Sequence, residues 1–311
     1  MAIEHACVRV VHKPWGSRDL RPWSCVDGSA DAVGELWFER ADADAPAPAL
    51  LLKFLFTSEP LSIQVHPDDT FARAIGLRSG KSEAWYILSA KLGAQIGVGL
   101  THRITPQELH ASIRNGSIVD LLHWREVAEG DSIFIPAGTI HAIGAGIVLA
   151  EIQQNSDVTF RLFDYGSQRQ LHEDDGVAVA NAGPLRDLRH PTHLTSARTV
   201  LVASRHFVLE QVDLPAGSSW ALQAEPETWV LVHAGHAAVG LAAVSIGQTI
   251  FVGGDRASIV VGADGLKALI AYPASRPVES LLQRLGEPSP RHEAPIAPAL
   301  SQSPGSVEVR T

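Results

Sequence analysis

The sequence is poor in cysteine: only Cys7 and Cys25 occur among its 311 residues. Two cysteines cannot build a disulfide framework, and they cannot form a thiolate metal site without other ligands. A reducing compartment is the simplest interpretation of this usage. We therefore predict a cytoplasmic protein.

Long apolar runs are missing as well. The first fifteen residues carry Glu4, Arg9 and Lys13 among their apolar residues and lack an apolar core of signal-peptide length. No other segment approaches the length of a membrane span. These observations predict a protein without a membrane partner.

Clusters of positive charge are also missing. The net charge is −9, and no Lys/Arg patch or stripe of the kind that binds nucleic acid is found. The hydrophobic fraction of 45% and the charged fraction of 19% are those of a soluble globular protein. Nucleic acid is thus excluded as a partner, and any anionic substrate must be held by a few local cations. Monomer and homodimer remain open.

Many short apolar runs, bounded by Gly, Pro and Asp, are what the sequence does contain. Such runs are typical of β-strands in a sandwich or barrel. They fall into two groups that are split near Pro184–Pro191, and length alone favours about two domains. We expect strands at 50–56, 61–66, 84–88, 94–98, 132–136 and 147–153, and then at 199–203, 207–212, 229–232, 249–252, 258–261 and 267–271.

The domain limits follow from this grouping. We predict a first domain over residues 1–188, a second over 189–275 and a C-terminal piece over 276–311. In that piece, 278–285 is expected to form a short helix, and the Pro-, Ser- and Ala-rich tail from Gly286 is expected to be disordered.

One region between the strands of the first group has helical signals. Thr105, Pro106 and Glu108 form a capping-box sequence with Pro at the first helical position. Asn115-Gly116 is a helix end, and Ser117 starts a second helical pattern that carries Leu121, Leu122 and Trp124. A small helical insertion over about 105–125 is therefore predicted.

Polar residues on the second of these strands give the first chemical signal. In Leu61-Ser62-Ile63-Gln64-Val65-His66, the side chains of Ser62, Gln64 and His66 point to one face because strand side chains alternate. A polar strand face held by hydrogen bonds is common, so this pattern alone is weak. Glu83, which heads the apolar strand of Lys81-Ser82-Glu83-Ala84-Trp85-Tyr86, is by itself also ambiguous.

The segment from Gly130 to His141 is more specific. It fits the second cupin motif, G-x5-P-x-G-x-x-H, at every fixed position, and in cupins that His faces into the barrel and binds metal. Two imidazoles, a carboxylate and an amide oxygen suit a divalent first-row metal and leave a position for water or a sugar hydroxyl. The expected ligands are Gln64, His66, Glu83 and His141.

These segments resemble the three metal-site segments of the type I mannose-6-phosphate isomerases. Lys13-Pro14-Trp15-Gly16 and Gly34-Glu35-Leu36-Trp37 look like the N-terminal motifs of that family, and 152–165 looks like its short bacterial form. The resemblance is dense from residue 13 to about 172. It implies a mainly β fold of two cupin-type jelly rolls, of which the second has lost its metal, because no His follows Gly247–Gly254.

The resemblance also implies a function. It implies one Zn²⁺ per chain, with another divalent metal left open, and interconversion of mannose 6-phosphate and fructose 6-phosphate through an enediol(ate). Carried over residue by residue, it implies catalytic roles for Lys81, Glu151 and Arg161, and a substrate role for Ser62. We add Trp15 and Arg169 as substrate-binding candidates. The identity of the base stays open among Glu151, Lys81 and a metal-bound water.

Each of these residues also has a simpler, structural explanation. Arg161 could pair with Asp157 or Asp164, Glu151 could be a structural partner of Arg161, and tryptophans such as Trp15 are more often core than sugar platforms. Arg169 does not align securely with the basic residue expected for phosphate. The alternatives are therefore an isomerase of free mannose or fructose, an iron-dependent cupin oxygenase, and a non-catalytic sugar-binding cupin.

Overall fold

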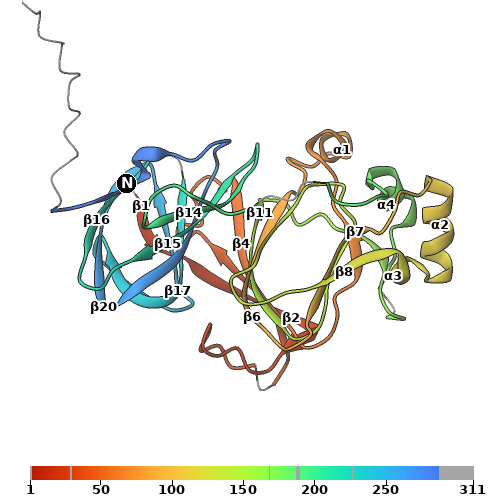
Figure 1. Cartoon of the computed structure of the whole chain (residues 1–311), viewed down its shortest axis with the longest axis horizontal. Helices are drawn as coiled ribbons and strands as arrows, with labels where there is room; N and C mark the ends of the chain where they lie inside the picture. Colours follow the sequence, from red (N-terminus) through yellow and green to blue (C-terminus); the bar gives the residue numbers. More distant parts are fainter. Residues whose placement is uncertain (1, 29, 168, 187–189, 226, 287–311) are drawn as a thin grey trace, which may run out of the picture.

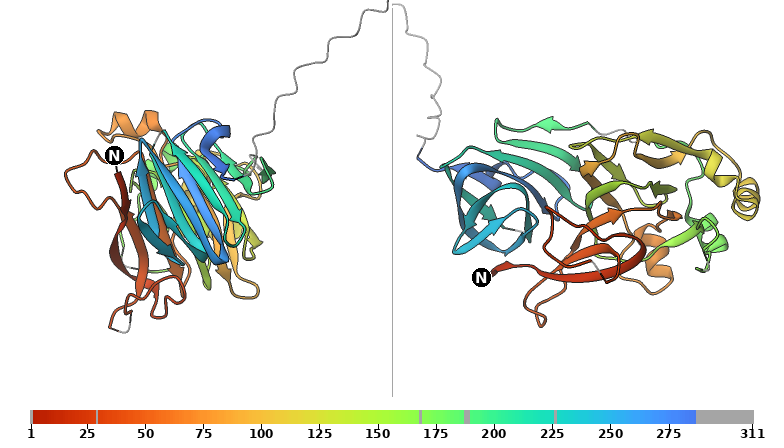
Figure 2. Two further views of the ribbon diagram at one scale, coloured as in Figure 1. Left: turned by 90° about the vertical axis from the view of Figure 1, so that its left-hand side faces the viewer. Right: turned by 90° about the horizontal axis from the view of Figure 1, so that it is seen from below.

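The computed structural model describes residues 2–28, 30–167, 169–186, 190–225 and 227–286. Its named strands pair antiparallel and make three sheets, so the predicted mainly β class is confirmed. Two sheets come from the N-terminal half and one from the C-terminal half, and the two halves lie side by side (Figure 1). Helices α2 and α4 lie at the end of the molecule that is remote from the C-terminal sheet (Figures 1 and 2).

The first sheet has six strands and runs through the middle of the molecule. Its inner face packs on the second sheet, and its outer face packs on the C-terminal half, so its strands are buried on both sides. Apolar residues are therefore needed at nearly every position. In order across the sheet, the strands are β2 (Cys7–Ser17), β3 (Val33–Glu39), β4 (Leu50–Thr57), β11 (Ile147–Gln154), β6 (Glu83–Ala90) and β9 (Ser132–Ile135).

The second sheet has five shorter strands. Its inner face completes the jelly-roll core with the first sheet, and its outer face is covered by helices. The strands are β12 (Phe160–Phe163), β5 (Ile63–Val65), β10 (His141–Ile143), β7 (Gln95–Leu100) and β8 (Leu122–Glu126), and the helices are α1 (Asp69–Ala74), α2 (Pro106–Asn115), α3 (Ile118–Leu121) and α4 (Glu173–Val179).

The helical insertion is confirmed, with one correction. The Thr105 hydroxyl accepts from the Glu108 N–H, the Glu108 carboxylate accepts in return from the Thr105 N–H, and Gly116 ends α2 with a φ of 80°. The second predicted helix is only one turn long, because residues 122–126 pair with β7 as strand β8. Neither α1 nor α4 was predicted.

The third sheet wraps into a second barrel around its own core. The strands predicted at 258–261 and 267–271 are one 18-residue strand, β20. Its first part pairs with β16 and its last part with β15. The sheet contains β1 (Ala2–His5), β13 (Thr192–His193), β14 (Arg198–Ala203), β15 (Val208–Leu214), β16 (Ser219–Ala224), β17 (Thr228–Val239), β18 (Ala242–Ser245), β19 (Thr249–Gly253), β20 (Asp255–Tyr272) and β21 (Leu282–Arg284).

Two segments near the ends of the chain differ from the expected arrangement. Strand β1 pairs with β19 of the C-terminal sheet, although it was assigned to the first domain. The helix expected over 278–285 is a 3-10 turn, Glu279–Leu281, followed by β21 on β16. The limit at 188 and the tail from 287 lie outside the described residues, so the division into domains stays a prediction.

Candidate metal and sugar site

The site lies at one end of the space between the two N-terminal sheets. His141 is paired with Gln64 across β10 and β5, and Arg161 is paired with Gln64 across β12 and β5. Glu83 and Glu151 come from the opposite sheet, where β6 and β11 are neighbours. Four separate stretches of sequence thus supply one cluster because the jelly roll closes.

Three of the four predicted metal ligands form a tight buried group. The ligand atoms of His66, Glu83 and His141 lie within 4.8 Å of one another. The two Glu83 oxygens lie 3.5 Å from His66 Nε2 and 3.4 Å from His141 Nε2. Among the described residues this is the one group of three or more His, Cys, Asp or Glu side chains with such geometry.

Backbone contacts orient both imidazoles. His66 Nδ1 lies 2.8 Å from the Val158 carbonyl oxygen, and His141 Nδ1 lies 2.9 Å from that of Thr139. A carbonyl can only accept, so Nδ1 carries the proton and the Nε2 lone pair points toward Glu83. His66 Nε2 and both Glu83 oxygens are buried without a hydrogen bond. Buried polar atoms left in this way fit a bound divalent cation.

Gln64 lies beside the group. Its amide nitrogen is 3.2 Å from His141 Nε2, and its Oε1 is 3.5 Å from the Ser62 hydroxyl. Amide oxygen and nitrogen are assigned from their hydrogen-bond partners. A half-turn of the amide would bring its oxygen to the side of His141 without moving the strand.

The protonation states suit metal binding. Burial, followed by the nearby Lys81 charge, lowers the pKa of His66 to about 3. Burial also lowers the pKa of His141. Burial opposes the charge on Glu83, but the nearby Lys81 charge outweighs it, and the pKa of that carboxyl lies well below its usual range. Two neutral imidazoles and a carboxylate are the forms that bind metal.

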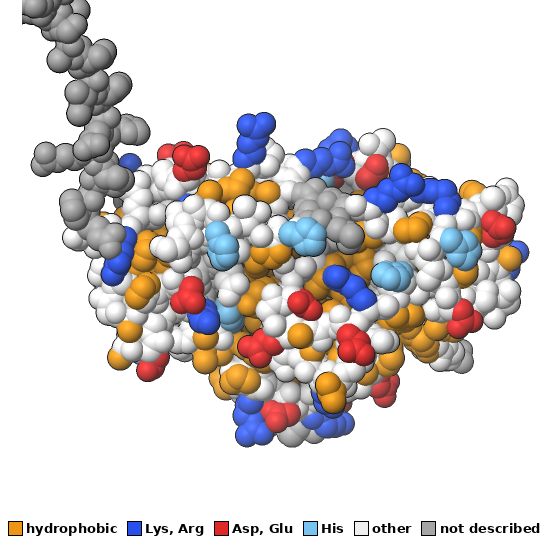
Figure 3. Space-filling model, viewed as in Figure 1, with side chains coloured by type: hydrophobic (Ala, Val, Ile, Leu, Met, Phe, Trp, Pro, Cys, Tyr) orange, Lys and Arg blue, Asp and Glu red, His pale blue; other side chains and the backbone are white. Residues whose placement is uncertain are grey.

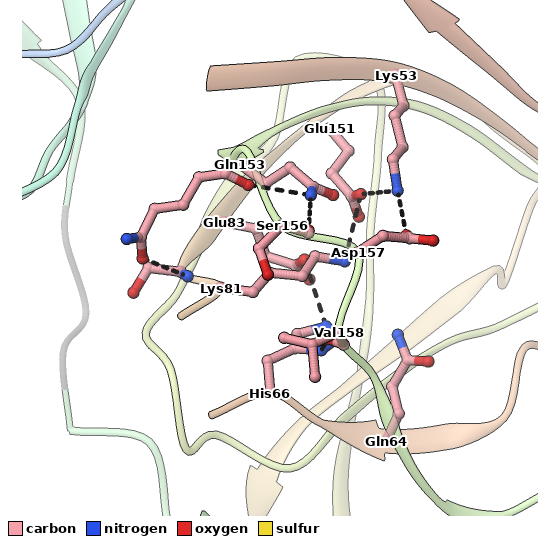
Figure 4. Close-up of polar contacts among 12 residues, drawn as sticks. Lys53, Gln64, His66, Lys81, Glu83, Glu151, Gln153, Ser156, Asp157 and Val158 are labelled. Atoms are coloured by element: carbon pink, nitrogen blue, oxygen red, sulfur yellow. Dashed lines mark hydrogen bonds and ion pairs between the residues drawn. The ribbon is translucent and has the colours of Figure 1, made fainter. Parts of the chain in front are cut away.

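A chain of alternating charges leads away from the ligands (Figure 4). Lys81 Nζ lies 3.0 Å from Glu83 and 3.7 Å from Glu151, and Lys53 Nζ lies 3.6 Å from Glu151. The Trp85 indole N–H donates to Glu151 at 3.2 Å. Burial, followed by the nearby Glu83 charge, raises the pKa of Glu151. Burial opposes the charge on Lys81, but Glu151 and Glu83 raise its pKa above the usual value.

The sequence analysis missed three charged residues of this group as functional candidates: Lys53, Glu35 and Asp157. Lys53 is 3% exposed, and its Nζ lies 3.7 Å from Glu35 and 3.2 Å from Asp157. It stands opposite Glu151 in the β4–β11 ladder. A single Lys inside Leu50-Leu51-Leu52-Lys53-Phe54-Leu55-Phe56 was the signal for it, because a buried charge needs a partner.

A cavity of about 210 Å³ opens beside the metal ligands. Its wall is polar and includes every predicted catalytic and substrate residue. The lining consists of Lys13, Trp15, Glu35, Lys53, Leu55, Leu61, Ser62, Gln64, Lys81, Glu151, Asp157, Thr159, Arg161 and Arg169.

The ion pairs considered for Arg161 do not form among the described residues. Asp157 pairs with Lys53, and Asp164 pairs with Arg169. The Arg161 Nη1 donates to the Gln170 carbonyl oxygen at 2.8 Å, while its Nε is buried without a hydrogen bond. Burial and the neighbouring Arg169 lower the pKa of Arg161. Two guanidinium groups at one cavity wall favour an anionic ligand.

The C-terminal half has no comparable group among its described residues. The Gly247–Gly254 segment contains strand β19, which pairs with β17 and β1. His233 packs against Tyr86, and His236 lies 3.7 Å from Asp264. The two imidazoles therefore have different neighbours and do not make a site together.

Comparisons with known proteins agree with this geometry. No family model matches the chain. It is 36% identical over 188 residues to the mannose-6-phosphate isomerase ManA of Bacillus subtilis (strain 168), covering 57% of this chain and 59% of that protein. It is 36% identical over 200 residues to the mannose-6-phosphate isomerase of Streptococcus mutans serotype c, covering 60% and 61%. The chain thus spans about three fifths of the length of these curated relatives.

The fold comparison extends further along the chain. The crystal structure of the mannose 6-phosphate isomerase from Bacillus subtilis matches with a TM-score of 0.76 and 24% identity, over 87% of this chain and 99% of that one. A putative mannosephosphate isomerase from Archaeoglobus fulgidus matches with a TM-score of 0.71 and 18% identity, over 88% and 97%. The chain is therefore similar in sequence to mannose-6-phosphate isomerases and shares their fold, which confirms the resemblance drawn from its motifs.

Proposed function

We propose that this chain is a zinc-dependent aldose–ketose isomerase that interconverts mannose 6-phosphate and fructose 6-phosphate. One observation carries the proposal: a buried His66–Glu83–His141 group with unfilled hydrogen-bonding atoms stands beside a cavity lined by acid–base side chains and two arginines. The relatives named above carry that activity in their names. Zinc is the metal we infer, since two imidazoles, a carboxylate and an amide oxygen suit it.

In this proposal, the metal is held by Gln64, His66, Glu83 and His141. When bound, it would supply a Lewis acid that stabilises negative charge on the sugar oxygens during enediol formation. The protein fixes the positions of these four side chains. The ligands come from two facing sheets, and the Nδ1–carbonyl contacts of His66 and His141 fix their ring orientation before metal arrives.

Proton movement falls to the residues around Glu151. Isomerisation takes a proton from C2 of the aldose and returns one to C1, and it also needs proton transfer between the two oxygens. Glu151 lines the cavity, is 4% exposed and is held by Lys81, Lys53 and Trp85. We infer that Glu151 moves the carbon-bound proton, and that Lys81 donates to a substrate oxygen.

The substrate's charged end is assigned to Arg161 and Arg169. Arg161 has a buried, unfilled Nε at the cavity, and a charge-assisted Arg–phosphate contact is the usual way to hold a dianion. Ser62 and Trp15 line the same cavity and are assigned to the sugar. Both Arg169 donors Nε and Nη2 are bound by Asp164, and this observation favours the alternative, an isomerase of uncharged mannose or fructose.

Other features remain predictions. Cys7 and Cys25 are free and exposed, and the reducing, cytoplasmic location stays a prediction. No helix among the described residues is long and apolar enough to cross a membrane. Positive and negative side chains both lie on the face shown in Figure 3, and the substrate is proposed to be a small molecule rather than nucleic acid. Monomer and homodimer both stay open.

The experiment that tests the proposal is an isomerase assay on metal-stripped and zinc-restored protein. We expect mannose 6-phosphate to be converted only by the restored protein, and free mannose to react much more slowly. Comparable rates on both sugars would move the assignment to the free-sugar isomerase. Run in D₂O, the reaction should place deuterium at C2 of mannose 6-phosphate formed from the ketose, whereas a direct hydride shift would leave none.

A further inference from the structure

Ser82 stands between two residues of the proposed site, Lys81 and Glu83. Strand β6 begins only at Glu83, where it pairs with Gln153 of β11. The backbone around Ser82 therefore lies just beyond the regular ladder. One residue, Gln154, nevertheless binds both of its main-chain groups: the Gln154 N–H donates to the Ser82 carbonyl at 3.1 Å, and the Ser82 N–H donates to the Gln154 side-chain oxygen at 2.9 Å.

The Gln154 amide is itself held in one orientation. Its Nε2 donates to Asp69 Oδ1 at 2.9 Å, and the same oxygen accepts from the Gly80 N–H at 2.9 Å. The side chain is 7% exposed, so neither end of the amide is compensated by bulk water. Gln154 thus ties Ser82 to β11, and it shares Asp69, the first residue of α1, with Gly80 at the other end of the turn around Lys81.

The same turn is linked to the other metal-ligand segment. The Ala137 N–H donates to the Ser82 hydroxyl at 3.2 Å, and the Gly138 N–H donates to the His66 carbonyl at 2.8 Å. Ala137 and Gly138 belong to the loop that leads to His141. A shift at Ser82 would therefore reach two ligand segments.

Glu151 lies three residues before Gln154 on the same strand, β11. Figure 4 shows Lys81 and Glu83 pointing from their turn toward Glu151 and His66. The 3.7 Å contact of Lys81 with Glu151 and the 3.0 Å contact of Lys81 with Glu83 thus depend on how the turn is fixed against β11. Gln154 does not line the cavity with Glu151, so it acts on the site through Ser82.

We propose that Gln154 is a positioning residue for the site: its side-chain amide extends the β6–β11 ladder by one step and sets where Lys81 and Glu83 stand relative to Glu151. The part of the proposal that concerns turnover rests on the proposed isomerase function. The part that concerns Glu83 as a metal ligand does not need the reaction at all.

The test is Gln154→Met, which keeps the length of the side chain and removes both hydrogen bonds of the amide. Zinc affinity, measured by competition with a chromophoric chelator, should fall about 10-fold or more, as is typical when an outer partner of a ligand is lost. With zinc saturating, kcat on mannose 6-phosphate should fall about 10- to 100-fold, while KM stays within about twofold because the cavity wall is intact.

Asn155→Ala is the matched control. Asn155 is the next residue, and its amide donates to the Pro48 carbonyl at 2.8 Å, away from the 80–83 turn. Loss of this Asn155–Pro48 hydrogen bond should lower thermal stability without changing zinc affinity or kcat. Gln154→Glu keeps an acceptor for the Ser82 N–H but loses the donor to Asp69, so its zinc affinity and kcat should lie between those of wild type and Gln154→Met. If Gln154→Met does not fold, Gln154→Glu can still be measured against wild type.

Two results would overturn the proposal. One is zinc affinity and kcat in a folded Gln154→Met protein that match those of Asn155→Ala. The other is a Gln154→Glu protein with wild-type kcat and zinc affinity beside a Gln154→Met protein that does not fold, because Gln154 would then serve folding alone. A wild-type protein without isomerase activity would refute the proposed function instead, and the zinc measurements would still decide the role of Gln154.

Discussion

Each half of the molecule buries a cluster of charged side chains, and the two clusters differ in whether their hydrogen bonds are filled. In the C-terminal barrel, Arg198 is 1% exposed and donates twice to Glu210 at 2.8 Å. Two further N–H groups of Arg198 donate to the carbonyl oxygens of Val278 and Glu279. The Tyr272 hydroxyl donates to Glu210 and accepts from the Val278 N–H at 3.0 Å.

The N-terminal cluster is built in the opposite way. His66 Nε2 and both Glu83 oxygens are buried without a hydrogen bond, although Glu83 also forms an ion pair with Lys81 at 3.0 Å. A folded protein rarely leaves such atoms unfilled. A saturated buried cluster stabilises a fold, and here it fixes the chain at 278–279 to the barrel. An unsaturated one indicates a missing ligand. We therefore propose that the His66–Glu83–His141 cluster serves chemistry and that the Arg198–Glu210 cluster serves structure.

The largest effect is expected from removing a ligand. His66→Ala and His141→Ala should each abolish tightly bound zinc and lower activity by more than about a hundredfold, since even outer partners of a ligand cost 10- to 100-fold. The measurements are metal content of the purified protein and the isomerase rate. Circular dichroism should show a folded chain in both cases, and normal zinc content in either variant would count against the site.

The counterpart in the second half is Arg198→Met. It leaves Glu210 buried without its partner, and breaking such a pair typically costs about 3–5 kcal/mol. Denaturant unfolding should show that loss, whereas zinc content should be unchanged. The double variant Arg198→Met/Glu210→Leu should recover much of the stability, because a buried pair can be replaced by apolar groups. Loss of zinc in Arg198→Met would erase the distinction between the halves.

A smaller effect is expected at the substrate end of the first half. If Arg169 holds the phosphate, Arg169→Ala should raise KM for mannose 6-phosphate about tenfold or more, in line with about 1.5–3 kcal/mol for a charged hydrogen bond. Turnover of free mannose should change little. Arg161→Ala should lower kcat as well. Equal effects of Arg169→Ala on both sugars would show that Arg169 does not bind the phosphate.

The smallest effect concerns His233, an imidazole of the second half without a metal partner. Burial, followed by the nearby Lys267 charge, lowers its pKa to about 4. A His whose folded-state pKa is lowered favours the folded state above its unfolded pKa of about 6.5, and this contribution is lost as the pH falls toward 4.

His233→Phe keeps a ring against Tyr86 and removes the titration. We expect the drop in Tm between pH 7 and pH 5 to be smaller in this variant than in wild type. An unchanged pH dependence of Tm would mean that His233 does not contribute to it.

The sequence showed which motifs meet at the site better than it showed the residues around them, for a physical reason. Gln64, His66, Glu83 and His141 lie in short local motifs whose spacing is set by strand alternation. Lys53 lies 98 residues before Glu151 in the chain, and only the register of β4 on β11 brings the two together.

The C-terminal half gave weaker signals. Gly262 and Gly265 look like strand ends, yet β20 continues through both as it passes from β16 to β15. Likewise, 278–285 has helical composition, but the carbonyl acceptors needed by Arg198 and the free edge of β16 hold it as a 3-10 turn and a strand. Such long-range demands are not visible in a local window of sequence.

The most direct test of the contrast between the halves is anomalous diffraction at the zinc edge from crystals of the zinc-loaded chain. We expect a single strong peak per chain, bounded by His66 Nε2, His141 Nε2, Glu83 and the Gln64 amide, with no peak beside His233, His236 or the Arg198–Glu210 pair. A zinc peak in the C-terminal barrel, or an empty His66–Glu83–His141 group in crystals that hold zinc elsewhere, would contradict this expectation.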